Sequence, residues 1–285
     1  MTSHIKFPMD RRSLLKAAAA TPALAAFGFS SMAHALPLDG IEKRGFMTVA
    51  TEDDYRPFEF TENGKPTGYD QELLDLMKKT VKFEVKQDII PWTGILPGVT
   101  TGKYDAAVTA ILITEERMKS LDFTSPVAQS ENFFLKRKGD KKITSIKDLN
   151  GLSLGVEAGS AMLKMLPQLD DMLKTTGGKL GKVVQYQGYP EAYQDLAVGR
   201  VDFVVNTQLS LASVVKEKPD VFEMGLAVSK PSYIAWAVQK GNTGLLKAFN
   251  DFLAASRKDG SMYALQKKWF SITFESMPDH PVANS

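Results

Sequence analysis

An arginine in an unusual position is the first residue of this chain that suggests chemistry. Residues 104–127 read YDAAVTAILITEERMKSLDFTSPV, and the apolar run 106–111 predicts a buried strand. Thr114 offers a side-chain oxygen as a helix N-cap, and two glutamates follow it, as the helix dipole prefers. Arg117 breaks that preference, because a cation in the first turn is unfavourable unless an anion binds there. The pattern predicts either a receptor for a carboxylate or a surface arginine paired with Asp122 or a neighbouring glutamate.

The composition excludes several other kinds of site. The 285 residues include no cysteine, so disulfides, cysteine-rich metal sites and thiol catalysis are excluded. There are only three histidines, two of them outside the expected folded core, which argues against a histidine-rich metal site. We therefore expect no metal and no cofactor. The length suits one large or two modest α/β domains.

The N-terminal residues 1–35 have the pattern of a cleaved export signal. Two arginines at 11–12 precede an apolar stretch over 17–31, and the sequence AHA at 33–35 fits a cleavage site. The segment DRRSLLK resembles the twin-arginine export motif, although a general secretion route stays open. Without cysteine no lipid can be attached at the new N-terminus, so we predict a soluble periplasmic protein.

Cleavage changes the charge of the chain. The segment 1–35 holds four of the 35 basic side chains and one of the 33 acidic ones, so its removal turns the net charge from +2 to −1. The basic excess of the full chain is therefore no sign of nucleic-acid binding, and we expect no such partner.

Strands and helices alternate along the rest of the chain. Strands are predicted at 46–51, 81–85, 106–111, 152–156, 182–186, 202–205, 222–228 and 233–238. Helices are predicted at 69–80, 93–102, from 160, at 190–199, after 205, at 244–258 and at 261–270. Residues 52–68 read as a loop, and 130–151 as a strand that runs into a basic, solvated connector. This alternation predicts an α/β fold with a largely parallel, doubly wound sheet.

A weak internal repeat suggests two lobes. GKYDAAV at 102–108 matches GRVDFVV at 199–205, each with a glycine, a basic residue and an aspartate that opens a buried strand. Two similarly built lobes with a ligand cleft between them would explain the match. The alternative is that any α/β protein reuses glycine at helix ends and aspartate before strands.

Three motifs in order resemble the family 3 extracellular solute-binding proteins, the periplasmic receptors of polar amino-acid ABC importers. They are TEDDYRPFEFTENGKPTGYDQEL, PWTGILPGVTTGKYDAAV and ITEERMKSLDFTSPV, and the similarity continues through LNGLSLGVEAGSA, LAVGRVDFVV and DGSMYALQKKWF. The resemblance implies a type II periplasmic-binding-protein fold, two doubly wound lobes joined by a two-strand hinge. Lobe 1 would comprise 36–128 plus 233–285, and lobe 2 would comprise 129–232, with crossings near 129–134 and 230–233.

The resemblance also implies roles for five residues. Arg117 would clamp a ligand carboxylate bidentately, and Tyr55 and Trp92 would cover the ligand side chain, although both could be core packing. Glu52 stands where an acid commonly receives a ligand ammonium, and its alternative is a solvated loop carboxylate. Ser160 matches a polar position that contacts the carboxylate, or it simply caps a helix.

Four site positions depart from the family pattern. Leu112 replaces a usual Ser or Thr, and Thr207 replaces the usual Asp that holds the α-ammonium. Ala110 and Ala161 stand where polar residues are common. A neutral hydroxyl cannot supply a charge-assisted bond, so recognition of a free α-ammonium is open unless Glu52 replaces the missing acid. The resemblance therefore leaves the ligand as an amino acid, an N-substituted amino acid, a carboxylate that lacks the amine, or a more aromatic compound that stacks on Trp92.

The expected function is that of a monomeric binding protein, not an enzyme. It would close its lobes on a small carboxylate ligand and deliver it to a membrane permease of an ABC importer. One alternative is a periplasmic accessory protein that has lost ligand binding and docks on another protein. A second is a dehydratase-like enzyme on the same fold, for which Glu52 and Glu157 are the obvious acid–base candidates.

Overall fold

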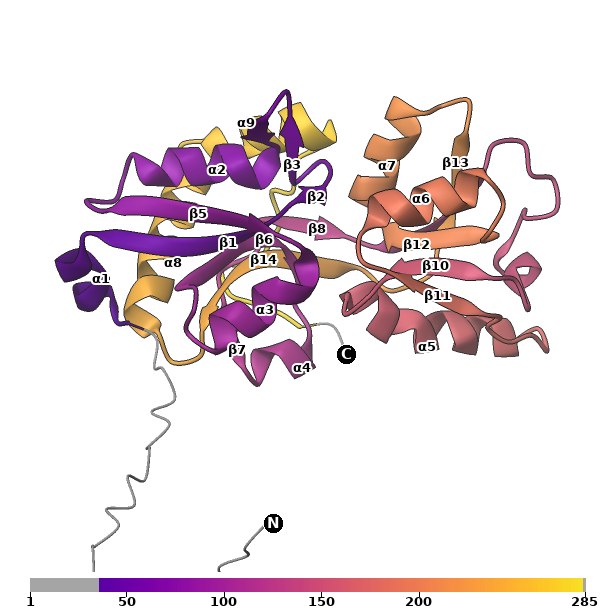
Figure 1. Ribbon diagram of the computed structural model, residues 1–285, viewed down its shortest axis with the longest axis horizontal. Coiled ribbons are helices and arrows are strands. Elements are labelled where there is room, and N and C mark those ends of the chain that lie inside the picture. The colour runs from indigo at the N-terminus through magenta and orange to yellow at the C-terminus, as the bar shows by residue number, and fades with distance from the viewer. Residues whose placement is uncertain (1–35, 284–285) are drawn as a thin grey trace, which may run out of the picture. The chain divides into compact units, whose positions relative to one another are not determined.

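The computed structural model describes residues 36–283, which form two large β-sheets flanked by helices and a small third sheet (Figure 1). The predicted export signal at 1–35 lies outside the described residues, so its cleavage and its twin-arginine route stay predictions. Between residues 36 and 283, each helix is too short or too polar to cross a membrane.

The first sheet is built on a parallel core. Its strands follow the order β5 (Glu84–Ile90), β1 (Phe46–Glu52), β6 (Ala106–Leu112), β14 (Ser232–Gln239) and β7 (Leu121–Phe123), and β8 (Ala128–Ser130) also pairs with β14. β1 is parallel to β5 and β6, whereas β14 is antiparallel to β6, β7 and β8. Its helices are α1 (Leu38–Arg44), α2 (Tyr69–Lys78), α3 (Trp92–Thr100), α4 (Glu115–Met118), α8 (Thr243–Lys258) and α9 (Ser261–Phe270). We call this assembly lobe 1.

Both faces of the first sheet are buried, because successive side chains of a strand point to opposite faces. Val49 and Val108 belong to the core cluster that includes residues of α2 and α8. Their chain neighbours Ala50 and Ala107 belong to a separate cluster with α3. The predicted doubly wound arrangement of lobe 1 follows from this alternation.

The second sheet is smaller and has the same kind of parallel centre. Its order is β11 (Val183–Tyr186), β10 (Leu154–Glu157), β12 (Phe203–Thr207), β9 (Asn132–Arg137) and β13 (Phe222–Ala227). β10 is parallel to β11 and β12, and β9 is antiparallel to β12 and β13. Its helices are α5 (Ala161–Lys174), α6 (Tyr189–Ala197), α7 (Gln208–Glu217) and the short 3₁₀ helix η1 (Ile146–Leu149). We call this assembly lobe 2.

The chain passes between the two sheets twice, from β8 to β9 and from β13 to β14. Two backbone hydrogen bonds tie the crossings to lobe 2: the Gln208 N–H donates to Glu131 O at 2.7 Å, and the Val228 N–H donates to Asn132 O at 2.7 Å. The proposed lobe boundaries at 128/129 and 232/233 stay a prediction.

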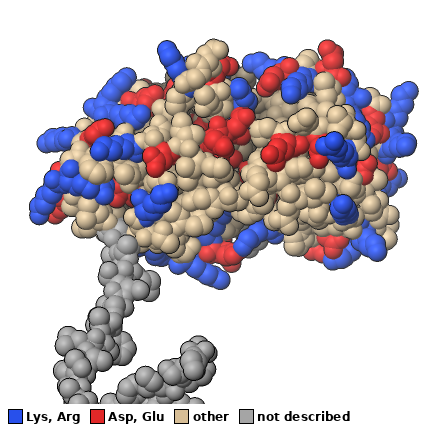
Figure 2. All heavy atoms as spheres, in the orientation of Figure 1, with Lys and Arg blue, Asp and Glu red and all other residues tan. Residues whose placement is uncertain are grey.

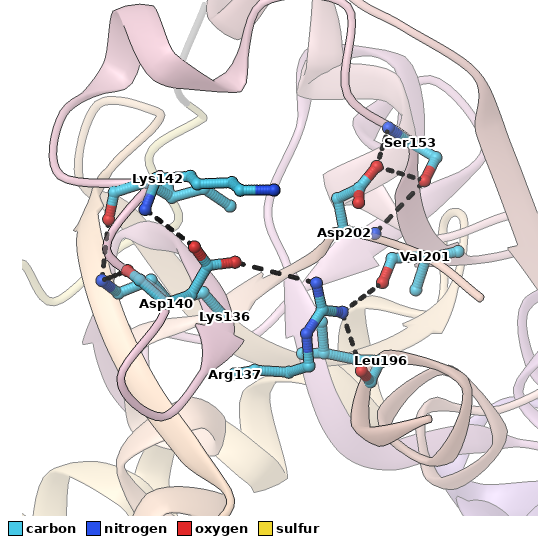
Figure 3. Close-up of polar contacts among 9 residues, drawn as sticks. Lys136, Arg137, Asp140, Lys142, Ser153, Leu196, Val201 and Asp202 are labelled. Atoms are coloured by element: carbon cyan, nitrogen blue, oxygen red, sulfur yellow. Dashed lines mark hydrogen bonds and ion pairs between the residues drawn. The ribbon is translucent and has the colours of Figure 1, made fainter. Parts of the chain in front are cut away.

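The sequence repeat corresponds to one structural device used in both lobes. The Asp105 carboxylate accepts hydrogen bonds from the backbone N–H and the hydroxyl of Thr48, at 2.7 and 2.9 Å. The Asp202 carboxylate does the same for Ser153, at 2.8 and 2.6 Å, as Figure 3 shows. Each aspartate therefore fastens the start of its own strand to the start of the parallel neighbour.

Two sequence predictions on lobe 1 were wrong. The segment 52–68 is not all loop, since β2 (Asp54–Tyr55), β3 (Glu59–Glu62) and β4 (Lys65–Thr67) form a small antiparallel sheet there. The strand predicted at 81–85 lies instead at Glu84–Ile90. Its bounds are set by pairing, because all seven residues of β5 align with the seven of β1, whereas local alternation marked only its beginning.

The last two residues of β9, Lys136 and Arg137, are held by backbone acceptors, whereas Lys138, Lys141 and Lys142 of the connector are exposed, as predicted. The Lys136 side chain is buried, and its ammonium donates to the Ile143 carbonyl at 2.7 Å and the Asp140 carbonyl at 3.0 Å. The Arg137 guanidinium donates to the carbonyls of Leu196 and Val201, at 3.0 and 2.9 Å (Figure 3). The acceptors of Lys136 are four and seven residues away in the chain, and those of Arg137 are 59 and 64 residues away; sequence composition revealed neither set.

Positive and negative side chains are interspersed over the face of the molecule that Figure 2 shows. Wide areas of uncharged residues separate them, without a single-sign field on that face. Such a mixture matches the near balance of basic and acidic residues in the sequence.

Candidate functional site

Eight of the nine predicted site residues line one small pocket between the lobes. Lobe 1 and lobe 2 contribute, in chain order, Glu52, Tyr55, Trp92, Ala110, Leu112, Arg117, Ser160 and Ala161. Glu157 and Met162 complete the lining. The ninth predicted residue, Thr207, lies beside the pocket, with its hydroxyl oxygen 3.3 Å from that of Tyr55.

Four strand ends position this pocket. β1 ends at Glu52 and β6 at Leu112 in lobe 1, while β10 ends at Glu157 and β12 at Thr207 in lobe 2. Ligand sites of open α/β sheets lie at the carboxyl ends of their parallel strands. Here the corresponding ends of two such sheets meet at one place.

Arg117 contacts both lobes. Its guanidinium donates to Leu112 O at 2.9 Å in lobe 1 and to Gly159 O at 3.4 Å in lobe 2, and it lies 5.0 Å from the Trp92 ring centre. Burial lowers the pKa of Arg117 to about 10, which still leaves it charged at neutral pH. Its helix is a single turn of four residues, capped by Thr114, so the predicted dipole effect is weak. The anion-binding capacity of this position comes from the guanidinium.

The alternative surface pairing of Arg117 is not what the described residues form. Asp122 pairs with Lys240 at 2.7 Å, and Glu116 pairs with Lys164 across the lobes. The candidate acids are therefore engaged with lysines. A guanidinium has five N–H donors, and the two carbonyl contacts leave donors for a carboxylate.

Tyr55 and Trp92 both pack in the protein and line the pocket. The exposed fractions are 4% for Tyr55 and 6% for Trp92, and the Tyr55 ring stacks on Phe58 at 5.7 Å. The Tyr55 hydroxyl donates to Asn206 Oδ1 at 2.8 Å, which links lobe 1 to lobe 2. Site lining and core packing, the two alternatives left by the sequence, therefore coexist at these positions.

Ser160 is the N-cap of α5. Its hydroxyl accepts from the Leu163 N–H at 3.2 Å and lies 2.8 Å from Glu157 O, to which it donates. Capping is thus the contact that the structure shows, and the same position brings the N-terminus of a 14-residue helix to the pocket wall.

The four residues that depart from the family pattern make part of the pocket lining apolar and leave position 207 uncharged. Leu112 and Ala161 are buried, and Ala110 is half-buried. Thr207 caps α7 and its hydroxyl lies 3.0 Å from that of Ser210. Position 207 offers no charge to a ligand ammonium.

Two carboxyl groups, one from each lobe, lie together in the pocket. Glu52 and Glu157 are only 5% and 2% exposed. Burial first, and then the repulsion of Glu157, raises the pKa of Glu52 well above its ordinary range. Burial likewise raises the pKa of Glu157, to about 8. The pair therefore retains a proton at neutral pH.

Glu157 is the site residue whose importance the sequence underestimated. It was named only as a candidate acid–base residue, yet it faces the pocket beside Glu52. One signal was available: Glu157 directly follows the predicted strand 152–156, as Glu52 follows 46–51. Both therefore stand at the ligand-binding ends of parallel strands.

The pocket itself is nearly filled. Its volume of about 10 Å³ is room for one water molecule. A second cavity of about 210 Å³ lies on the other side of Tyr55, lined among others by Tyr189, Tyr193 and Asn206. Entry of an amino-acid-sized ligand into the first pocket requires that the lobes separate.

Comparison with known proteins identifies the family. The model of the bacterial extracellular solute-binding proteins, family 3, matches residues 47–272. The chain belongs to this family. Family 3 solute-binding proteins are periplasmic or extracellular.

Several characterised family members are similar along most of their length. The L-cystine-binding protein TcyJ of Escherichia coli (strain K12) is 32% identical over 262 residues, which cover 91% of this chain and 95% of that protein. An ancestral arginine-binding protein bound to arginine has a TM-score of 0.72 and 32% identity, over 80% of this chain and 99% of that one. The type II periplasmic-binding-protein fold inferred from sequence is thereby confirmed.

One structural neighbour is a binding protein that is also the precursor of an enzyme. The ancestral amino acid-binding protein AncCDT-1, a precursor of cyclohexadienyl dehydratase, has a TM-score of 0.73 and 30% identity over 81% of this chain and 98% of that chain. It is itself described as a binding protein, as are the relatives above.

Proposed function

We propose that this family 3 protein is the periplasmic receptor of an ABC importer and captures an amino acid or a related small carboxylate between its lobes. Its relatives are named for binding cystine and arginine, and both of these ligands carry α-carboxylates. Separation and closure of the lobes about the two crossing segments would admit and enclose the ligand. The enclosed form would then deliver it to a membrane permease.

The observation that carries this proposal is the environment of Arg117. Its guanidinium faces the pocket and donates to carbonyl oxygens of both lobes, while the nearby Asp122 and Glu116 pair with lysines. A ligand carboxylate can take the remaining donors and replace the long 3.4 Å contact to Gly159 O. Such a carboxylate would bridge the lobes through one side chain.

Thermal denaturation with a panel of free amino acids tests this proposal. A ligand that binds the folded protein raises the melting temperature by an amount set by its concentration relative to Kd. Arg117→Ala should remove that rise, because a buried carboxylate without its partner loses roughly 2–5 kcal/mol. Arg117→Lys should restore only part of it, since an ammonium lacks the planar fork.

Arg200→Ala is the matched control, because Arg200 is an exposed arginine of lobe 2 that pairs with Asp195. It should leave the ligand-induced rise unchanged. If no amino acid stabilises the wild-type protein, the proposal fails and the accessory docking role is favoured. If Arg117→Ala responds like the wild type, the carboxylate is held elsewhere.

The proposal includes no chemical reaction and no cofactor. Glu157 has the raised pKa of an acid catalyst, but the same shift follows from burying any carboxyl beside another.

We also propose export by the segment 1–35, with cleavage after Ala35 and the twin arginines as the sorting signal. N-terminal sequencing of exported protein should begin at Leu36, and an intact Met1 would contradict cleavage.

A further inference from the structure

We propose that Asn206 of lobe 2 is a positioning residue for Tyr55 of lobe 1, and that the buried hydrogen bond between them holds the lobes closed over the pocket. Among the described residues, Tyr55 lines the small pocket and Asn206 does not, so Asn206 acts on a ligand through Tyr55. The inference rests on the lobe motion of the proposed function and adds a residue that controls it.

The side chain of Asn206 is fixed within its own lobe. Asn206 is the second-last residue of β12 and is fully buried. Its Oδ1 accepts from the Thr207 N–H at 2.7 Å, and its Nδ2 donates to the Tyr193 hydroxyl at 2.8 Å. A backbone N–H can only donate, so the first bond determines which side of the amide is the oxygen. Lobe 2 therefore presents a carbonyl oxygen to lobe 1 in a set orientation.

Tyr55 supplies the donor from lobe 1. It ends β2, its hydroxyl donates to Asn206 Oδ1 at 2.8 Å, and the hydroxyl oxygen lies 3.3 Å from Thr207 Oγ1. The ring stacks on Phe58 of lobe 1 at 5.7 Å and lies 5.9 Å from the Tyr189 ring of lobe 2. The bond to Asn206 therefore fixes the ring that covers the pocket when the lobes meet.

The other contacts between the lobes are of different kinds. The Glu116–Lys164 ion pair is exposed, so salt screens it and it contributes little. The contact of Arg117 to lobe 2 is long, at 3.4 Å, and a ligand carboxylate would replace it. The bond from Tyr55 to Asn206 is neutral and buried, and it leaves the donors of Arg117 available. It therefore favours closure whatever the ligand.

The size of the effect follows from what each group does when the lobes separate. The Tyr55 hydroxyl exchanges Asn206 for water, while Asn206 Oδ1 keeps the Thr207 N–H. One neutral hydrogen bond exchanged in this way changes an equilibrium about two- to tenfold. Because an enclosed ligand leaves only after the lobes separate, the same bond slows ligand release.

Distances between two spin labels, measured by pulsed electron paramagnetic resonance, test the inference without any ligand. The chain has no cysteine, so Lys119→Cys and Asp171→Cys give two unique labelling sites. Both positions are exposed, one beside α4 in lobe 1 and one on α5 in lobe 2, and the Glu116–Lys164 pair joins these two helices across the lobes. The full mature protein is first unfolded and refolded to remove bound compounds.

We expect a short and a long distance, which represent closed and open lobes. Tyr55→Phe keeps the ring and removes the hydroxyl, and it should raise the open-to-closed ratio about two- to tenfold. Asn206→Ala should shift the ratio in the same direction. Tyr189→Phe is the matched control, because that hydroxyl donates to Val205 O within lobe 2, and it should leave the ratio unchanged.

Two further measurements separate the bond from a merely structural role of Asn206. The double variant Tyr55→Phe/Asn206→Ala should shift the ratio no further than Asn206→Ala alone, because both changes remove the same bond. The shift in Tyr55→Phe should also be equal at about 0.05 M and about 0.5 M salt, whereas any shift in Lys164→Ala should vanish at the higher concentration.

Three results would overturn the inference: a wild type without a closed population, an unchanged ratio in Tyr55→Phe, or additive shifts in the double variant. If Asn206→Ala fails to fold, Tyr55→Phe and Tyr189→Phe still decide the outcome. The proposed function does not depend on these results, since it fails only if no amino acid in the panel stabilises the protein.

Discussion

Two pairs of buried carboxyl groups lie close to each other in this protein but have different surroundings. Glu59 and Asp70 lie inside lobe 1, where Thr109 donates to Glu59 and the Trp236 indole N–H donates to Asp70 at 2.7 Å. Glu52 and Glu157 lie in the pocket, and Glu157 Oε1 has no such donor in the described part of the chain. Glu59 Oε2 and Asp70 Oδ2 also lack a partner among residues 36–283, so the two pairs differ in that the core pair receives donors from its own lobe.

The comparison shows that burial and a raised pKa do not by themselves identify a site. Burial is the first cause of the raised pKa for Glu59, for Asp70, for which it reaches about 6, and for both pocket glutamates. What differs is location: both core acids come from one lobe, and the pocket acids come from two. Only the second pair can be separated when lobes move apart.

Replacing one acid of each pair by alanine should give the largest difference between the pairs, measured as the free energy of unfolding. Asp70→Ala leaves the Trp236 N–H and the Glu59 carboxyl buried without their partner, so we expect a loss of about 2–4 kcal/mol in the free energy of unfolding. Glu157→Ala removes the repulsion that Glu157 exerts on the buried Glu52 and should change the free energy of unfolding of the ligand-free protein by less than about 1 kcal/mol.

Urea denaturation of the ligand-free variants measures both values. Asp70→Asn is the control for the core pair, because an amide keeps an acceptor for Trp236 and supplies a donor for Glu59. It should retain most of the stability. A Glu157→Ala protein that is destabilised more than Asp70→Ala would show that the pocket pair is a structural element.

The residues that form the pocket could be predicted from the sequence only in part. The strand ends at Glu52 and Leu112 follow from short apolar runs, and the motif after Leu112 indicated Arg117 correctly as a residue near the pocket. The dipole argument for Arg117 was weaker than it looked, because α4 has only four residues. Its contacts to Leu112 O and Gly159 O depend on the meeting of two lobes, which no local pattern encodes.

The pairing of Glu52 with Glu157 was not predictable from composition or periodicity. Each residue alone reads as an acid after a strand, and solvation is the ordinary expectation for such a residue. Their proximity depends on how the second sheet is placed against the first.

The pH dependence of the free energy of unfolding also tests whether the buried carboxyls hold protons, and its expected effect is smaller. A carboxyl whose pKa is raised in the folded state binds more protons there than in the unfolded chain, so the free energy of unfolding decreases as pH rises through that range. We expect the ligand-free protein to lose stability between about pH 4.5 and pH 8, the ordinary value and the raised pKa of Glu157.

Glu157→Gln should make this decrease shallower above pH 6, because it removes a pocket carboxyl whose pKa is raised to about 8. Melting temperatures across this pH range measure the change, with Glu191→Gln as the control, because Glu191 is an exposed glutamate on α6 of the same lobe. Identical profiles for Glu157→Gln and the wild type would mean that the pocket pair does not retain its proton.

The most direct test of the account is to identify what the protein carries. Native mass spectrometry of protein purified without denaturation, followed by release and identification of the bound compound, measures this. The account predicts a small molecule with a carboxylate, present in the wild type and Arg200→Ala and absent from Arg117→Ala. A bound compound that lacks a carboxylate, or one that Arg117→Ala retains in full, would contradict it.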